Sequence, residues 1–323
     1  MSLFPFSYAT GLAMTLAFSC SQALADDYPK KPIRLIVPFA AGTPSDNIAR
    51  IFSTHAEKKL GQPIIVENKA GANGTIGAQQ VAKSAPDGYT ILMGTNTPLA
   101  AAPSLYKNLS YDVNKSFTPV AYMGGMPLLV VVNPELPAKS LTEFVDYAKK
   151  SPAPVTFGSA ASGQLATTQL VSQATAVKFL HVPFKAATEV ISSVISGDVT
   201  LFSGEIVATL PLVKSGRLKA LGVSSQNRSP LAPEIPTIAE SLGRDFEVLA
   251  WYAVVAPANT PEPIVLKLNM AFNDVLKDTT ALARINAMGL VPEARQPEQL
   301  ASFMQAEIPK WANALKLAGV VPE

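Results

Sequence analysis

The residues best suited to chemistry in this sequence lie in small-residue turns that follow short apolar strands. The first example runs from Ile33 to Arg50, with the sequence IRLIVPFAAGTPSDNIAR. Its short β-branched start predicts a buried strand. Residues 40–45 are almost all small, so backbone N–H groups can approach a guest closely, and Ser45 or Asp46 is placed to cap the following helix. Either this is an ordinary strand-to-helix connection, or it binds a carboxylate or phosphate at the helix N-terminus.

Residues for acid–base, nucleophilic or metal chemistry are scarce. The two histidines each have a structural explanation, since His55 lies beside the apolar stripe of the first helix and His181 ends a strand. The glycines from Gly71 to Gly77 lack the tight first G-x-G of a dinucleotide fingerprint, and no G-x-S-x-G, H-E-x-x-H or P-loop occurs. A metal site would need more histidines or a cysteine nearby. The sequence therefore predicts no catalytic residue, no metal site and no cofactor.

The elements that must position such turns alternate between strand and helix in two groups. Strands are expected at 33–37, 64–66 and 89–93 in the first group, and at 128–132, 155–157, 177–182, 199–202 and 218–223 in the second. The long apolar segment from Phe246 to Ala256 is expected to return the chain toward the first sheet, and the last third is expected to be helical. Strands alternating with helices predict an α/β protein with mainly parallel sheets flanked by helices.

Composition and the N-terminal segment indicate where the protein works. The 26 Lys and Arg residues against 24 Asp and Glu are scattered, which argues against a nucleic-acid partner. Gly11 to Ser19 is apolar but too short to span a bilayer, and Ala23-Leu24-Ala25 follows as a cleavage site. We interpret residues 1–25 as a secretory signal peptide, with lipoprotein processing at Cys20 as the alternative to signal peptidase I. The mature chain is therefore expected in the periplasm, without cysteine.

Six motifs in order along the chain carry a resemblance to a known family. They are YPKKPIRLIVPFAAGTPSDNIAR, VENKAGANGTIGA, APDGYTILMGT, LSYDVNKSFTPVA, HVPFK and KSGRLKALGVSS. With these motifs the whole mature chain resembles the Bug family of periplasmic solute receptors, which serve tripartite tricarboxylate transporters. The resemblance implies a two-lobed type II periplasmic binding-protein fold with a central ligand cleft, in which two lobes close on a small carboxylated solute by hinge motion. We expect lobe 1 at 26–123 plus 250–323, lobe 2 at 124–249, permease subunits as partners, and a monomer.

The same resemblance indicates which turns contact the ligand, because ligands in such folds sit where strand ends and helix N-termini face the crevice. Phe39 is expected to pack on the ligand body, and the small-residue turns are expected to supply N–H and hydroxyl donors. Asp46 is expected to support its helix, because two anions in one site repel each other. Glu205 is either an exposed acid or a partner for an ammonium or hydroxyl group on the ligand. The predicted ligand-binding residues are Phe39, Ala41, Gly42, Thr43, Ser45, Thr95, Asn96, Thr97, Ser159, Ala160, Ser162, Gly163, Phe184, Ala186 and Glu205.

The chain also departs from the family pattern at positions that bear on the ligand. Thr43-Pro44 replaces part of a turn that is usually rich in Pro and Gly, and Phe184, Thr200 and Glu205 stand where other residues are common. These departures affect the identity of the ligand more than the fold. Other functions stay open at this stage: a secreted α/β enzyme acting on a small carboxylated molecule, or the same kind of receptor serving an ATP-driven or TRAP-type importer or a sensor.

Overall fold

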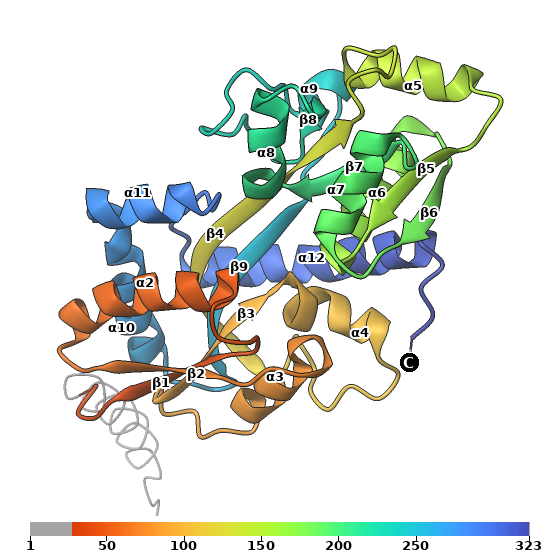
Figure 1. Cartoon of the computed structure of the whole chain (residues 1–323). Helices are drawn as coiled ribbons and strands as arrows, with labels where there is room; N and C mark the ends of the chain where they lie inside the picture. The colour runs from red at the N-terminus through yellow and green to blue at the C-terminus, as the bar shows by residue number, and fades with distance from the viewer. Residues whose placement is uncertain (1–27, 323) are drawn as a thin grey trace, which may run out of the picture.

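The computed structural model describes residues 28–322, so the predicted signal peptide at 1–25 lies outside the described residues. Two α/β lobes share a pair of long strands that cross the centre of the molecule (Figure 1). No helix within residues 28–322 combines the length and the apolar character that crossing a membrane requires. The elements of lobe 1 and of the shared strands are β1 (Ile33–Val37), α2 (Pro44–Leu60), β2 (Ile64–Asn68), η1 (Ala72–Gly74), α3 (Thr75–Ala82), β3 (Thr90–Thr95), η2 (Thr97–Ala101), α4 (Ala102–Leu105), β4 (Phe117–Val132) and β9 (Leu249–Pro257).

The second lobe and the C-terminal helices complete the chain. Lobe 2 consists of α5 (Leu141–Lys150), β5 (Val155–Ser159), α6 (Ser162–Thr175), β6 (Phe179–Pro183), α7 (Ala187–Ser196), β7 (Leu201–Glu205), α8 (Ile206–Lys214), β8 (Lys219–Val223) and α9 (Ile238–Leu242). After β9 the chain forms α10 (Glu262–Asn273), η3 (Asp274–Lys277), α11 (Thr279–Ala287) and α12 (Pro297–Leu317). The predicted alternation of strands and helices and the helical last third are therefore confirmed.

The sheet is mixed, and the antiparallel pairs lie where the lobes meet. The strand order is β2-β1-β3-β9-β4-β7-β5-β6, with β8 also paired to β4. The outer strands of both lobes pair in parallel, as predicted. By contrast, β4 and β9 pair antiparallel with each other and with their other neighbours. A mainly parallel sheet thus describes the outer part of each lobe but not the centre.

Strand β4 is much longer than the sequence predicted. Residues 117–127 pair with β9, and residues 128–132 pair with β7 and β8, so one strand passes from the first sheet into the second. The prediction of a strand at 128–132 missed the first part because Pro119 and the pair Gly124-Gly125 normally indicate a break. Here they fall at register shifts in the β4–β9 ladder, where a bulge tolerates them.

Helix α12 lies behind the crossing strands and joins both lobes (Figure 1). It packs against η2 in lobe 1 and against α6 in lobe 2. Its Glu307 is 3% exposed and accepts the indole N–H groups of Trp251 (2.7 Å) and Trp311 (2.8 Å). The same carboxylate pairs with Lys310. Because a buried carboxylate is stable only when its acceptor sites are filled, this cluster holds α12 firmly against strand β9.

Gly124 offers a direct test of how tightly the crossing strand is fitted. Its φ is +134°, and a Cβ there would lie 2.8 Å from the Cα of Pro292 and collide with the Val291 carbonyl oxygen. We expect Gly124→Ala to lower the free energy of unfolding by about 2–4 kcal/mol, because left-handed strain and overpacking add. Gly243→Ala is the matched control. The φ of Gly243 is +63° and no atom lies within 4 Å of an added Cβ, so this substitution causes backbone strain without overpacking. Equal losses in urea unfolding would contradict the close approach.

Candidate functional site

The turn of lobe 1 that is predicted to bind an anion, residues 40–45, is shaped by Thr43 and Pro44. Pro44 begins α2, and its fixed φ suits the first helical position. The cap therefore falls one residue earlier, on Thr43, whose hydroxyl donates to the Ala40 carbonyl (2.7 Å) and accepts the Asp46 N–H (3.4 Å). The prediction that Ser45 or Asp46 caps this helix is wrong, because both lie inside its first turn.

Asp46 supports the turn, as predicted. Its buried carboxylate accepts the Gly42 N–H (2.9 Å) and the Asn68 side-chain N–H (3.0 Å), and it pairs with Arg50 (3.0 Å). Burial raises the pKa of Asp46, but the hydrogen bonds from Arg50, Gly42 and Asn68 outweigh it and hold the pKa below its usual range. The Gly42 N–H is therefore occupied by Asp46, and Pro44 has no N–H to offer a ligand.

The other predicted residues of lobe 1 lie around the end of β3. Thr95 and Asn96 are buried and Thr97 is half-buried, and the three lead directly into η2. The Thr95 hydroxyl is buried without a hydrogen-bond partner in the described structure. Phe39 is half-buried, whereas Ala41 is exposed. Thr95 therefore has an unused hydroxyl at the carboxyl end of a parallel strand, where ligands of open α/β sheets bind.

In lobe 2 the N-terminus of α6 has no side-chain cap. Ala161 occupies the cap position, and Ser162 and Gly163 are the first two helical residues, both half-buried. The Ala160 N–H instead donates to the Gln164 side-chain oxygen (2.8 Å). Uncapped N–H groups at a helix N-terminus are suited to a carboxylate.

A second turn of lobe 2, at residues 181–186, is hydrogen-bonded to Ser159 at the end of β5. The Ser159 hydroxyl hydrogen-bonds His181 Nε2 (2.8 Å), and the Ser159 carbonyl accepts the Phe184 N–H (2.9 Å). Burial lowers the pKa of His181, so its imidazole is neutral at pH 7. Ala186 is the cap residue of α7 and likewise has no capping side chain. The predicted residues Ser159, Phe184 and Ala186 thus share one edge of the lobe 2 sheet.

Tyr252 of β9 lies near residues of both lobes. Its phenol lies near the Ser45 side chain of lobe 1 and near Glu205 of lobe 2. Burial, with the negative charge of Glu205, raises the pKa of Tyr252 to about 12, although the Ser45 hydroxyl acts in the opposite direction. Glu205 is the last residue of β7. Gln164 Nε2 donates to its carboxylate and lies 3.3 Å from Oε1 and 3.2 Å from Oε2. We call Ser45, Gln164, Glu205 and Tyr252 the junction cluster.

Sequence reasoning missed two members of this cluster. Tyr252 lies in the apolar segment that was expected only to return the chain toward the first sheet, and Gln164 directly follows the predicted Ser162 and Gly163. A phenol inside an otherwise apolar strand, and an amide in the first turn after a small-residue turn, were the available signals. Which lobe each side chain would meet depended on the tertiary fold.

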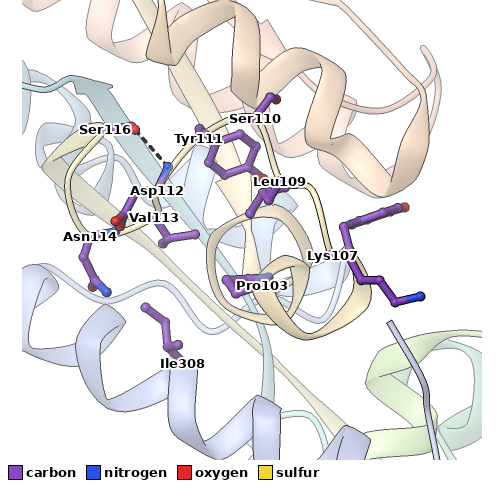
Figure 2. A pocket seen from close by; sticks show the side chains of 11 residues that line it. Pro103, Lys107, Leu109, Ser110, Tyr111, Asp112, Val113, Asn114, Ser116 and Ile308 are labelled. Carbon is purple, nitrogen blue, oxygen red and sulfur yellow. Dashed lines mark hydrogen bonds between the residues drawn. The ribbon is translucent and has the colours of Figure 1, made fainter. Parts of the chain in front are cut away.

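A separate cavity of about 690 Å³ lies at the side of lobe 1 (Figure 2). Residues 106–116, which connect α4 to β4, form most of its wall, with Ile308 of α12 opposite. The Asp112 N–H donates to the Ser116 hydroxyl (3.0 Å) and holds this loop in shape. The cavity contains none of the predicted ligand-binding residues. No group of three or more His, Cys, Asp or Glu within residues 28–322 is placed to hold a metal ion.

Comparison with known proteins decides the family. The family model described as the tripartite tricarboxylate transporter family receptor matches residues 48–320. The chain belongs to this family. BugT of Bordetella pertussis is 34% identical to it over 312 residues, covering 96% of each chain. A protein of Agrobacterium vitis, named for the TAR-I ttuE-ttuC' intergenic region, is 34% identical over 299 residues, covering 91% of this chain and 86% of its own.

Solved structures of similar proteins confirm the fold. Rpa4515 of R. palustris, solved with adipate, has a TM-score of 0.74 at 30% identity and covers 92% of this chain and 100% of its own. MatC of Rhodopseudomonas palustris, solved with malate, has a TM-score of 0.69 at 35% identity and covers 89% of this chain and 100% of its own. A TctC solute-binding protein from Polaromonas, solved without ligand, has a TM-score of 0.81 at 26% identity and covers 90% of this chain and 99% of its own.

The raised pKa of Tyr252 predicts a loss of stability in alkali. Unfolded tyrosine releases its proton near pH 10, whereas the folded phenol keeps it to about pH 12. The folded state therefore binds more protons in this window, and the free energy of unfolding falls as pH rises through it. Between pH 9 and 11.5 we expect the free energy of unfolding of Tyr252→Phe to fall less than that of the wild type, with a difference of at most about 2 kcal/mol. Urea unfolding at matched pH measures this, and parallel declines would refute the assignment.

Proposed function

We propose that this chain is the periplasmic receptor of a tripartite tricarboxylate transporter and that it captures a small carboxylate between its lobes. The observation that carries the proposal is the junction cluster, in which one phenol on a shared strand meets Ser45 of lobe 1 and lies near Glu205 of lobe 2. Both residues lie at strand ends or first helical turns, which is where ligands of such sheets bind. Family members solved with adipate and malate support a carboxylate as the ligand.

The ligand carboxylate is proposed to bind where two helix N-termini offer donors. In lobe 1 the donors are the Ser45 N–H and the Thr95 hydroxyl, and in lobe 2 they are the uncapped N–H groups at Ser162 and Gly163. Each hydrogen bond to a carboxylate contributes about 1.5–3 kcal/mol. The helix dipoles add about 0.3–1 kcal/mol for each terminus. Phe39 and Phe184, both half-buried, supply the apolar contact.

Lobe closure is proposed to bend the crossing strands. The exchange of β4 between the sheets at Pro127 and Leu128 supports a lobe boundary close to the proposed one, with 26–123 plus 250–323 in lobe 1 and 124–249 in lobe 2. The higher TM-score to the structure without ligand, despite lower identity, is consistent with lobes that stand apart. A ligand that contacts both lobes would shift this state toward closure.

The remaining parts of the proposal concern how the receptor is used. We propose that it is secreted by its N-terminal 25 residues, acts as a monomer without cofactor or catalysis, and delivers its ligand to permease subunits. Membership of a solute-binding family supports the assignment of a receptor rather than an enzyme.

A ligand screen tests the receptor function. Purified protein is heated with mono-, di- and tricarboxylates, aromatic acids and amino acids, and each mixture is then analysed for products. A ligand at about 100 times its dissociation constant adds about 2.7 kcal/mol to the stability of the folded state, which raises the melting temperature by several degrees. We expect at least one such ligand and no turnover. Stoichiometric product formation would support the secreted enzyme instead.

Thr43→Glu tests the anion-binding turn of lobe 1. The new carboxylate would stand at the start of α2 and repel a ligand carboxylate there, so we expect affinity to fall at least 100-fold. The fold should persist, because loss of the threonine cap costs about 1 kcal/mol. Thr43→Ser keeps the cap and is the control, with affinity expected within about 3-fold of the wild type by the same capping rule. Unchanged affinity in Thr43→Glu, measured by calorimetry, would place the carboxylate elsewhere.

A further inference from the structure

Glu205 is an acid at the lobe junction that forms no ion pair with any residue from 28 to 322. Its side chain is half-buried at the last residue of β7. Its side-chain partner is the neutral amide of Gln164, at 3.2–3.3 Å. A carboxylate has about four acceptor sites, so one amide leaves most of them available.

The surrounding groups fix the direction in which Glu205 can accept. Gln164 is itself held, since its oxygen accepts the Ala160 N–H at 2.8 Å and its nitrogen must then face Glu205. The Tyr252 phenol stays protonated in neutral solution and lies near both Ser45 and Glu205. Glu205 is therefore placed between the uncapped N-terminus of α6 and the shared strand β9, beside the region proposed to hold the ligand carboxylate.

A plain dicarboxylate fits this arrangement poorly. One of its carboxylates is stabilised at the helix N-termini, but the rest of the molecule offers Glu205 no donor, and a second carboxylate nearby repels it. An ammonium or hydroxyl group close to the bound carboxylate donates to Glu205 instead. Hydrogen bonds to charged groups are the stronger ones, and an ammonium adds charge attraction.

We infer that Glu205 selects carboxylates that carry a hydrogen-bond donor, an ammonium or a hydroxyl group, on a nearby carbon over the corresponding plain acids. This inference rests on the proposed receptor function and specifies the ligand class of the same site. Gln164 acts as a positioning residue, because it holds the Glu205 carboxylate without contacting the ligand donor itself.

The test compares acids that differ in one substituent. Four carbon skeletons are each taken in plain, hydroxy and amino form: propionate, lactate and alanine; succinate, malate and aspartate; glutarate, 2-hydroxyglutarate and glutamate; hydrocinnamate, phenyllactate and phenylalanine. Calorimetric titration of the wild type should give at least 10-fold tighter binding for a hydroxy or amino form than for its plain partner. The ratio between the hydroxy and amino forms tells which donor Glu205 prefers.

Two variants and one control identify the residue responsible. In Glu205→Gln, which is nearly isosteric, we expect the preference to fall below 3-fold and the plain acid to bind more tightly than it does to the wild type. Gln164→Met removes the amide that positions the Glu205 carboxylate but keeps the glutamate itself, so we expect a reduced preference. Glu135→Gln makes the same change of charge at an exposed loop position and should leave the preference unchanged.

The outcomes separate the two proposals. If no compound binds the wild type at 10 mM, the receptor function fails and this inference fails with it. If plain acids bind as tightly as their hydroxy and amino partners, or if folded Glu205→Gln keeps the preference, the inference is overturned while the receptor function stands. Should Glu205→Gln not fold, an unchanged preference in Gln164→Met overturns it.

Discussion

The antiparallel pairing of β4 with β9 is the constraint on which both lobes depend. Residues 117–127 of β4 pair with β9, and the next five residues of β4 belong to the sheet of lobe 2. One continuous backbone thus fixes the position of each parallel sheet relative to the other. Because the turns predicted to face a ligand follow the strands of those sheets, the position of every predicted contact depends on this pair. The collision that any side chain at Gly124 would have with Val291 shows how closely the backbone of β4 packs against the segment that follows α11.

The two faces of β9 have different environments. Trp251 and Tyr252 are consecutive and therefore point to opposite faces of the strand. On one face Trp251 donates to Glu307, which also accepts Trp311 and pairs with Lys310, so α12 is fixed to the strand by a buried carboxylate with three partners. Removing one partner from such a buried group costs about 3–5 kcal/mol. On the other face Tyr252 lies near Ser45 of lobe 1 and Glu205 of lobe 2. The Trp251 face is thus held to α12 by hydrogen bonds, whereas the Tyr252 face is directed toward the proposed ligand site.

Sequence periodicity predicted most of the elements, because the strands of each lobe are short, apolar and separated by helices with clear ends, such as Gly61 after α2. It predicted the supporting role of Asp46 from charge repulsion alone. It did not predict the first part of β4, since Pro119 and Gly124 carry local signals of a break that the bulged ladder overrides. The cap of α2 falls on Thr43 rather than on Ser45 or Asp46 because Pro44 favours the first helical position. Tyr252 and Gln164 were missed because their importance arises from partners far away in the sequence, at Ser45 and Glu205.

In the proposed receptor, the unpaired charge of Glu205 would link ligand recognition to lobe closure. While the lobes are apart, water can reach this half-buried acid and solvate it. Closure would remove that water, and desolvating a carboxylate without a partner is expensive. A ligand with a donor replaces the lost water, whereas a ligand without one leaves the charge unpaired at the moment the lobes meet. Since a ligand shifts a conformational equilibrium only by its differential affinity for the two states, discrimination at Glu205 would act on closure rather than on first contact. Specificity would then be expressed in the population of the closed state, the form that differs most from the unliganded receptor when a permease meets it.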